Sequence, residues 1–281
     1  MDGERPSGMD PERPSDTDPE RPSGDSGAGP LLLAIDTSGA VGSVALARGE
    51  ELVASEFLPE RGAHARRLIP VIGGLLRTAG VSRRELQGIV VGLGPGSFTG
   101  VRIAAATARG LAAGLGVPVW GWSSLAAGAA THRLALPEGM RRGAGIWRVP
   151  GFDARGEPEL PSEANEWPRY VLMDARGDRI YGGCYRIFPD RMETLVEPRG
   201  GTIHQVLEEP LPSPVLFCGE GALRHAPLLE EAGHRVLPLP AGLPTAHGLL
   251  RVHHLHPGAE PFAPDDRWEP AYIRSSSARP S

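Results

Sequence analysis

Runs of apolar residues, separated by turns rich in glycine and proline, divide most of the chain into two similar halves. Continuous apolar runs predict strands that are buried on both faces, and apolar residues three or four apart predict helices that bury one face. In the first half, these patterns predict strands at 31–38, 41–49 and 51–59, a helix at 64–80, a strand at 88–93, a helix at 98–115 and a strand at 117–122.

The second half repeats this order. The patterns predict strands at 170–177, 179–187 and 191–198, a short helix at 202–209, a strand opening into a glycine turn at 215–222, a helix at 223–233 and a strand at 234–239. An aspartate ends the first strand of each half, Asp36 and Asp174. Two βββαβα units of this kind describe an α/β protein with the duplicated ribonuclease-H-like, or actin-like ATPase, two-lobe fold.

Two segments fall outside the pattern. Residues 2–25 repeat every eight positions as DGERPSGM, DPERPSDT and DPERPSGD, and 139–168 are rich in glycine, proline and charge without periodicity. Such segments cannot bury enough apolar surface to fold by themselves. We therefore expect a disordered acidic tail at 1–29, an N-terminal lobe at 30–130, an inserted loop or linker at 131–168, and a C-terminal lobe with its terminal segment at 169–281.

Charge is concentrated in the tail. Residues 1–29 hold eight acidic residues and three arginines, which accounts for the whole net charge of −5 and leaves 26 acidic and 26 basic residues in the body. A neutral body argues against unaided nucleic-acid binding. The two cysteines, Cys184 and Cys218, lie in apolar stretches, as expected of buried thiols in a cytoplasmic protein. Neither a secretory signal nor an apolar run long enough to cross a membrane is recognisable.

Candidate chemistry centres on GPGSFTG at 94–100, between a buried strand and a helix. The start of a helix after a glycine turn can bind phosphate through backbone N–H groups. Alternatively, Ser97 caps the helix and the glycines permit a sharp turn. The loop lacks the Gly-Lys-Ser/Thr end of a Walker loop. With the turn after the first strand, the candidate anion- or nucleotide-binding residues are Asp36, Thr37, Ser38, Gly94, Gly96, Ser97, Thr99 and Gly100.

The helices at 64–79 and 98–115 carry small or apolar residues on more than one side. Such breadth fits packing against the chain's own sheet, and it also fits half of an intermolecular helical bundle. The cluster His253, His254 and His256 could suggest a metal site, but no spaced cysteine or carboxylate accompanies it, so we expect surface histidines.

Five stretches, in order, resemble the TsaB (YeaZ) family: LLAIDTSGAVGSVAL, RGAHARRLIPVI, GLGPGSFTGVRIAAATARGLAAGLGVPVWGWSSL, MDARGDRIYGGCY and EPAYIR. The string GPGSFTGVRI is very specific for this family. The resemblance covers about residues 31–274, apart from 139–168. It implies a non-catalytic paralogue of TsaD, the subunit that transfers the threonylcarbamoyl group to adenosine 37 of tRNAs that read ANN codons.

The resemblance also implies partners. TsaB-like proteins bind TsaD through the helices that correspond to 64–79 and 98–115, the TsaE ATPase joins the complex, tRNA is engaged indirectly, and a homodimer is the alternative when TsaD is absent. The implied partner-facing residues are His64, Leu68, Ile72, Leu75, Val101, Arg102, Ala104, Ala105 and Ala108. We expect an arginine at Leu75 or Ala108 to lie in solvent in the free subunit, sparing folding and abolishing partner binding.

Finally, the resemblance bears on catalysis. TsaD holds a metal through a His-x-x-x-His pair, whereas His64 is followed here by Leu68, so neither a metal site nor catalytic residues are expected. No cofactor of its own is implied, although ATP or ADP could bind at the complex. Ala104 replaces the glycine of the family's VRIG pattern. The alternatives are an actin-like kinase or carbamoyl-transfer enzyme with its own nucleotide site, and a metalloprotease, which the missing histidine disfavours.

Overall fold

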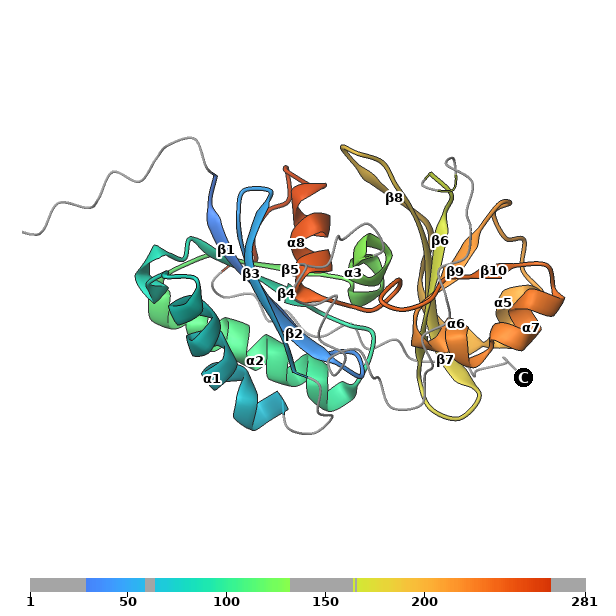
Figure 1. Ribbon diagram of the computed structural model, residues 1–281, viewed down its shortest axis with the longest axis horizontal. Helices are drawn as coiled ribbons and strands as arrows, with labels where there is room; N and C mark the ends of the chain where they lie inside the picture. The colour runs from blue at the N-terminus through green and yellow to red at the C-terminus, as the bar shows by residue number, and fades with distance from the viewer. Residues whose placement is uncertain (1–28, 59–63, 132–163, 165, 264–281) are drawn as a thin grey trace, which may run out of the picture.

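The computed structural model describes residues 29–58, 64–131, 164 and 166–263. They form two α/β lobes, each built on a five-stranded mixed sheet (Figure 1). The repeat tail, nearly all of the segment 139–168 and the EPAYIR motif lie outside the described residues. No helix in the described ranges is long and apolar enough to span a membrane.

The N-terminal sheet has the strand order β3-β2-β1-β4-β5. Its strands are β1 (Leu31–Asp36), β2 (Gly42–Arg48), β3 (Glu51–Leu58), β4 (Gly88–Gly92) and β5 (Val119–Trp122). Strand β1 pairs antiparallel with β2 and parallel with β4. Both β1 and β4 are buried along their whole length, as their continuous apolar runs predict.

Helices α1 (His64–Thr78) and α2 (Phe98–Leu115) cover one face of this sheet, joined through the short helix η1 (Arg83–Glu85) and β4 (Figure 1). The side chain of Ser97 caps α2 by accepting a hydrogen bond from the Gly100 N–H. The helix ends at Gly116, whose φ of 67° is the left-handed conformation that favours glycine. The predicted range of α2 is therefore confirmed.

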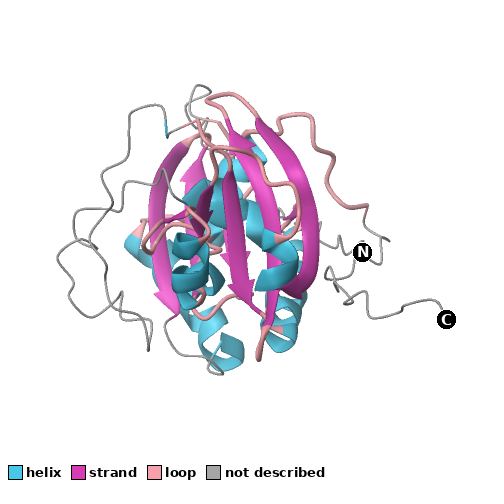
Figure 2. Cartoon of the chain, turned by 90° about the vertical axis from the view of Figure 1, so that its right-hand side faces the viewer, coloured by secondary structure: helices cyan, strands magenta, loops and turns pink. Residues whose placement is uncertain are grey.

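The C-terminal sheet repeats the first in the order β8-β7-β6-β9-β10. Figure 2 shows the molecule from the side on which this lobe lies. Its strands are β6 (Arg169–Asp174), β7 (Arg179–Ile187), β8 (Met192–Thr202), β9 (Leu216–Cys218) and β10 (Arg235–Val236). Its helices are α5 (Ile203–Leu207), α6 (Glu220–Arg224) and α7 (Ala226–Glu231). The single helix predicted at 223–233 is wrong, because the chain breaks at His225 into α6 and α7. The predicted duplication is confirmed.

The lobes exchange one helix each. Helix α3 (Ser124–Thr131) follows the N-terminal sheet but packs on β6 and β7, whereas α8 (Ala246–His254) follows the C-terminal sheet and returns to β1, β2 and β4. The two helices lie side by side between the sheets (Figure 1). A Cβ atom at Gly248 would lie 2.2 Å from the Ala127 carbonyl oxygen, so this close crossing requires glycine. Neither helix was predicted from the sequence.

Candidate functional site

The turn after β1 and the glycine loop before α2 are packed directly against each other. The Ser97 N–H donates a hydrogen bond of 2.7 Å to the Ser38 carbonyl oxygen, and Thr37 Oγ1 donates one of 2.6 Å to the Gly100 carbonyl oxygen. Because β1 and β4 are parallel neighbours, both turns emerge at the same edge of the sheet. The start of α2 is therefore tied to the residues that follow β1.

The glycines in this loop make room for protein backbone. A Cβ atom at Gly96 would lie 2.4 Å from the Ser38 carbonyl oxygen, and one at Gly100 would lie 1.9 Å from the Thr37 carbonyl oxygen. Both distances are far below van der Waals contact, and the atoms met are backbone atoms that no rotamer change can move. The close approach of the two turns explains both glycines without a phosphate.

Asp36 is fully buried at the centre of this arrangement, with 0% exposure. Its Oδ1 accepts hydrogen bonds from the Ser38 N–H at 2.8 Å and from Ser38 Oγ at 2.6 Å, and its Oδ2 accepts one from Ser124 Oγ at 2.8 Å. A Cβ atom at Gly92 would lie 2.0 Å from Oδ2, so Gly92 leaves the space that the carboxylate occupies. A buried carboxylate needs such donors, because desolvation of an unpaired charge is costly.

Ser124 extends this network to the first turn of α3. Its N–H donates to the Gly94 carbonyl oxygen at 2.8 Å, and its Oγ accepts from the Gly94 N–H at 3.1 Å. One hydroxyl thus joins Asp36, the glycine loop and the helix that enters the other lobe. Sequence reasoning missed Ser124; the available signal was a pair of serines directly after a strand, in WGWSSL.

The structure therefore brings Asp36, Thr37 and Ser38 together with the loop 94–100, as the sequence predicted. Thr99 differs from the rest, because it is exposed on the first turn of α2. An anion or nucleotide site at these residues stays a prediction. What the geometry assigns to them is a structural role: the carboxylate oxygens and several backbone groups bond to other parts of the same chain.

Most of the predicted partner-facing side chains point into the N-terminal lobe. Exposure is 6% at Leu75, 0% at Ala108 and at most 4% at the others that form this inner stripe, namely Leu68, Ile72, Val101 and Ala104. The expectation that an arginine at Leu75 or Ala108 would lie in solvent is therefore wrong. Both residues belong to the cluster that packs on the sheet. Of the remaining three, Arg102 is exposed, Ala105 is half-buried, and the His64 side chain lies outside what the structure describes.

The outer faces of α1 and α2 carry different residues. Ile69 of α1 and Phe98 of α2 are 54% and 56% exposed, which is unusual for large apolar side chains. The Arg102 guanidinium carbon lies 3.7 Å from the centre of the Phe98 ring. Besides Phe98 and two arginines, α2 exposes small residues, among them Ala106 and Gly110.

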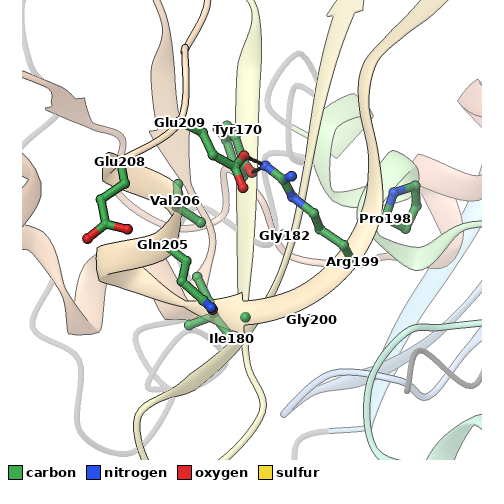
Figure 3. Close-up of a pocket in the computed structure, with 11 residues that line it drawn as sticks. Tyr170, Ile180, Gly182, Pro198, Arg199, Gly200, Gln205, Val206, Glu208 and Glu209 are labelled. Carbon is green, nitrogen blue, oxygen red and sulfur yellow. Dashed lines mark hydrogen bonds and ion pairs between the residues drawn. The ribbon is translucent and has the colours of Figure 1, made fainter. Parts of the chain in front are cut away.

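A polar cavity of about 600 Å³ lies in the C-terminal lobe between β8 and α5 (Figure 3). Arg199 donates to the Tyr170 hydroxyl at 3.2 Å and forms an ion pair with Glu209. Burial raises the pKa of Tyr170, although Arg199 opposes this, so the phenol stays neutral. Arg199, the only arginine or lysine among the described residues that line the cavity, is thus already paired with a carboxylate. No sequence pattern indicated this cavity.

In the histidine cluster at 253–256, His254 is exposed as predicted, whereas His253 and His256 are half-buried, which corrects the prediction for these two. The His253 ring lies 4.7 Å from Trp120 and the His256 ring 4.6 Å from Trp122, measured between ring centroids. Burial lowers the pKa of His253, while His254 pairs with Glu50 at 2.8 Å. Within the described residues, no group of three or more His, Cys, Asp or Glu side chains could hold a metal ion.

Two sheets of identical strand order, with one helix exchanged between the lobes, define the class of the molecule as an actin-like two-lobe α/β protein. Residues 57–141, which span α1 to α3, match the family model described as TsaD, tRNA N6-adenosine threonylcarbamoyltransferase.

Comparison with individual proteins places the chain more closely. It is 32% identical over 220 residues to the tRNA threonylcarbamoyladenosine biosynthesis protein TsaB of Escherichia coli, covering 69% of this chain and 91% of that protein. It is 29% identical over 202 residues to the protein of that name from Bacillus subtilis, covering 71% and 75%. A crystal structure from Pseudomonas aeruginosa, described as an uncharacterized protein with similarity to peptidase YEAZ, superposes with a TM-score of 0.65 at 27% identity, covering 87% of this chain and all of that one. The chain belongs to the TsaB family.

Proposed function

We propose that this chain is a non-catalytic subunit required for threonylcarbamoyl transfer to N6 of adenosine 37 in tRNAs that read ANN codons, and that it acts by binding TsaD. The observation that carries the non-catalytic part is the arrangement around Asp36. The buried carboxylate of Asp36 accepts hydrogen bonds from Ser38 and Ser124 through both of its oxygens. Such a group holds loops together and is poorly placed to act as a base or to bind a metal.

The outer face of α1 and α2 supports the proposal that TsaD is the binding partner. Large apolar side chains at Ile69 and Phe98 are exposed, and the exposed small residues of α2, such as Ala106 and Gly110, let another helix approach closely. Because residues 57–141 match TsaD, a TsaD molecule is expected to carry two equivalent helices. Two such faces can pair about a pseudo-twofold axis as a four-helix bundle. A homodimer would use the same face, and TsaE would join the heterodimer.

An omission assay tests the role directly. The organism's own TsaD and TsaE, tRNA, ATP and the threonylcarbamoyl donor are combined with and without this chain, and modified adenosine is counted. We expect modification only when the chain is present. Equal modification without it would contradict the proposal. ATP hydrolysis by the chain alone would favour the second candidate, an actin-like enzyme with its own nucleotide site.

Arginine substitutions test the binding face. Ile69→Arg and Ala106→Arg place a charge on the outer face, so we expect wild-type unfolding curves and no co-elution with TsaD. Leu228→Arg is the matched control, because Leu228 is a partly exposed apolar residue of α7 on the other lobe. Normal TsaD binding by both outer-face variants would exclude this face as the interface.

A further inference from the structure

The face formed by α1, η1 and α2 is strongly cationic, although the body of the chain carries no net charge. Residues 64–115 contain seven arginines and one acidic residue, and all eight are exposed. They are Arg66, Arg67, Arg77, Arg83, Arg84, Glu85, Arg102 and Arg109. A formal net charge of +6 over residues 64–115 attracts a polyanionic partner over roughly a Debye length, about 8 to 10 Å at physiological salt.

A groove of about 510 Å³ lies at one end of this face, where η1 adjoins the C-terminal halves of α1 and α2. Arg83 and Arg84 line it beside apolar side chains, and neither arginine forms an ion pair with another described residue. A Cβ atom added at Gly110 or Gly114 would meet no atom within 4 Å, so α2 leaves this side of the groove open. The groove thus combines an apolar floor with unneutralised positive charge.

The acidic tail leaves the folded body close to this groove. The Leu31 N–H donates to Gln87 Oε1 and the Gln87 N–H donates to the Leu31 carbonyl oxygen, both at 2.9 Å. Residue 31 is therefore fixed beside the segment that directly follows Arg83 and Arg84. A flexible chain of 28 residues has a typical end-to-end distance of about 30 Å. Helix α2 is about 27 Å long at 1.5 Å per residue, so a tail of this reach is long enough to extend along the groove.

We propose that the acidic repeat at residues 1–28 occupies the groove of its own molecule, with its carboxylates paired to Arg83, Arg84 and the neighbouring arginines. The tail carries eight acidic residues against three arginines, so it is the complement in charge of this face. Single exposed ion pairs are weak and screened by salt. Tethering, however, holds the tail near the groove at an effective concentration of order millimolar, which makes weak multiple contacts sufficient.

The docked tail also has a consequence for partner binding. Because the groove adjoins the outer face of α1 and α2, the tail competes with TsaD and slows the formation of the complex. This consequence rests on the proposed function, whereas the docking itself does not. A second copy of the chain is a different occupant of the same groove, and the experiment below separates the two cases.

A spin label on the tail of the full-length chain tests the docking. Cys184 and Cys218 are both fully buried, so a nitroxide can be attached selectively to a Ser15→Cys variant under native conditions. At low salt, we expect the amide signals of Gly110 and Gly114 to lose intensity, while that of Leu228 on the other lobe keeps it. This loss disappears at about 1 M salt, where the Debye length falls to about 3 Å.

Two further variants supply the controls. Arg83→Gln with Arg84→Gln should restore the Gly110 and Gly114 signals. Arg176→Gln with Arg179→Gln, which removes the same charge from an exposed part of the C-terminal lobe, should leave the loss unchanged. Loss that survives in the first double variant, or that merely declines with distance from residue 29, overturns the proposal.

Mixing two differently labelled samples of the chain distinguishes docking within one molecule from docking onto a second copy. When isotope-labelled chain without the nitroxide is mixed with unlabelled, nitroxide-bearing chain, the intramolecular proposal expects no loss of signal. Loss in this mixture would assign the groove to a second copy and overturn docking within one molecule. Displacement of the tail by TsaD is measured separately, by comparing TsaD association rates of the wild-type chain and of a variant with all eight tail carboxylates changed to amides. If TsaD does not bind either chain, the proposed function fails while the spin-label result stands.

Discussion

Gly100 provides a sharp test of the interlocked loops, because Gly110 on the same helix is a natural control. A Cβ atom at position 100 would lie 1.9 Å from the Thr37 carbonyl oxygen and 3.0 Å from its carbon. An ordinary contact begins at about 3.4 Å, so the two backbones must separate by about 1.5 Å. This separation would break the buried hydrogen bond from Thr37 Oγ1 to the Gly100 carbonyl oxygen.

The expected destabilisation follows from two unfavourable effects and one favourable effect. Overpacking costs about 1 to 3 kcal/mol, and a buried polar group left without its partner costs about 1 to 3 kcal/mol. Against these costs, alanine favours a helix over glycine by about 1 kcal/mol. The free energy of unfolding of Gly100→Ala should therefore fall by about 1 to 5 kcal/mol. Gly110→Ala meets no atom within 4 Å and should gain up to about 1 kcal/mol.

Urea unfolding followed by circular dichroism measures both variants, with equal m-values as the condition for comparing them. If Gly100→Ala is as stable as Gly110→Ala, the two turns do not constrain each other and the structural explanation of the loop is refuted. A stable Gly100→Ala variant would instead favour the phosphate-binding interpretation, in which glycine is needed at position 100 only when a nucleotide is bound.

Three other predictions follow from buried groups. Asp36→Asn places an amide against donors from Ser38 and Ser124, and should lower the free energy of unfolding by about 1 to 3 kcal/mol in urea titrations; wild-type stability would deny the carboxylate its structural role. Burial raises the pKa of Cys184 and Cys218 to about 12, so neither thiol should react with a thiol reagent at pH 8 until the chain is unfolded, and fast native labelling would contradict their burial. Burial lowers the pKa of His247 to about 4 from 6.5, so its contribution to stability is complete above pH 6.5 and is lost as pH falls toward 4. His247→Gln should remove at most about 3 kcal/mol of that acid-induced loss, and an identical pH profile would refute the assignment.

Much of the fold could be predicted because its central strands and helix α2 are specified by residues that are close together in the sequence. The apolar runs that become β1 and β4 are buried on both faces, and α2 carries both of its caps, Ser97 and Gly116, at the ends of its pattern. The duplication followed from the repeated order of these signals. Each such element is specified by residues that are neighbours in sequence, and a periodicity argument detects that information.

The exchanged helices could not be found in this way. All eight residues of α3 are buried, so the helix has no polar face and its sequence, SLAAGAAT, shows no helical periodicity. Its conformation depends on β6, β7 and α8, which lie far away in the sequence. The same limit applies to which side of α2 packs on the sheet. Ala106 is exposed and Ala108 is fully buried, although both are alanine. Only the position of the sheet distinguishes the two.

The glycine loop shows how this chain uses an arrangement that could serve phosphate binding. The residue types are those of an anion site, but here the space beside Gly96 and Gly100 is filled by the backbone of Ser38 and Thr37. The loop therefore fixes where α2 begins and, through Ser124, ties it to α3 and the second lobe. Because the inner side of α2 packs on the sheet, the partner contact that we propose falls to its outer side. That side carries the exposed Phe98 ring, the open glycines and the arginines, so changes there should alter binding while changes at the loop alter folding.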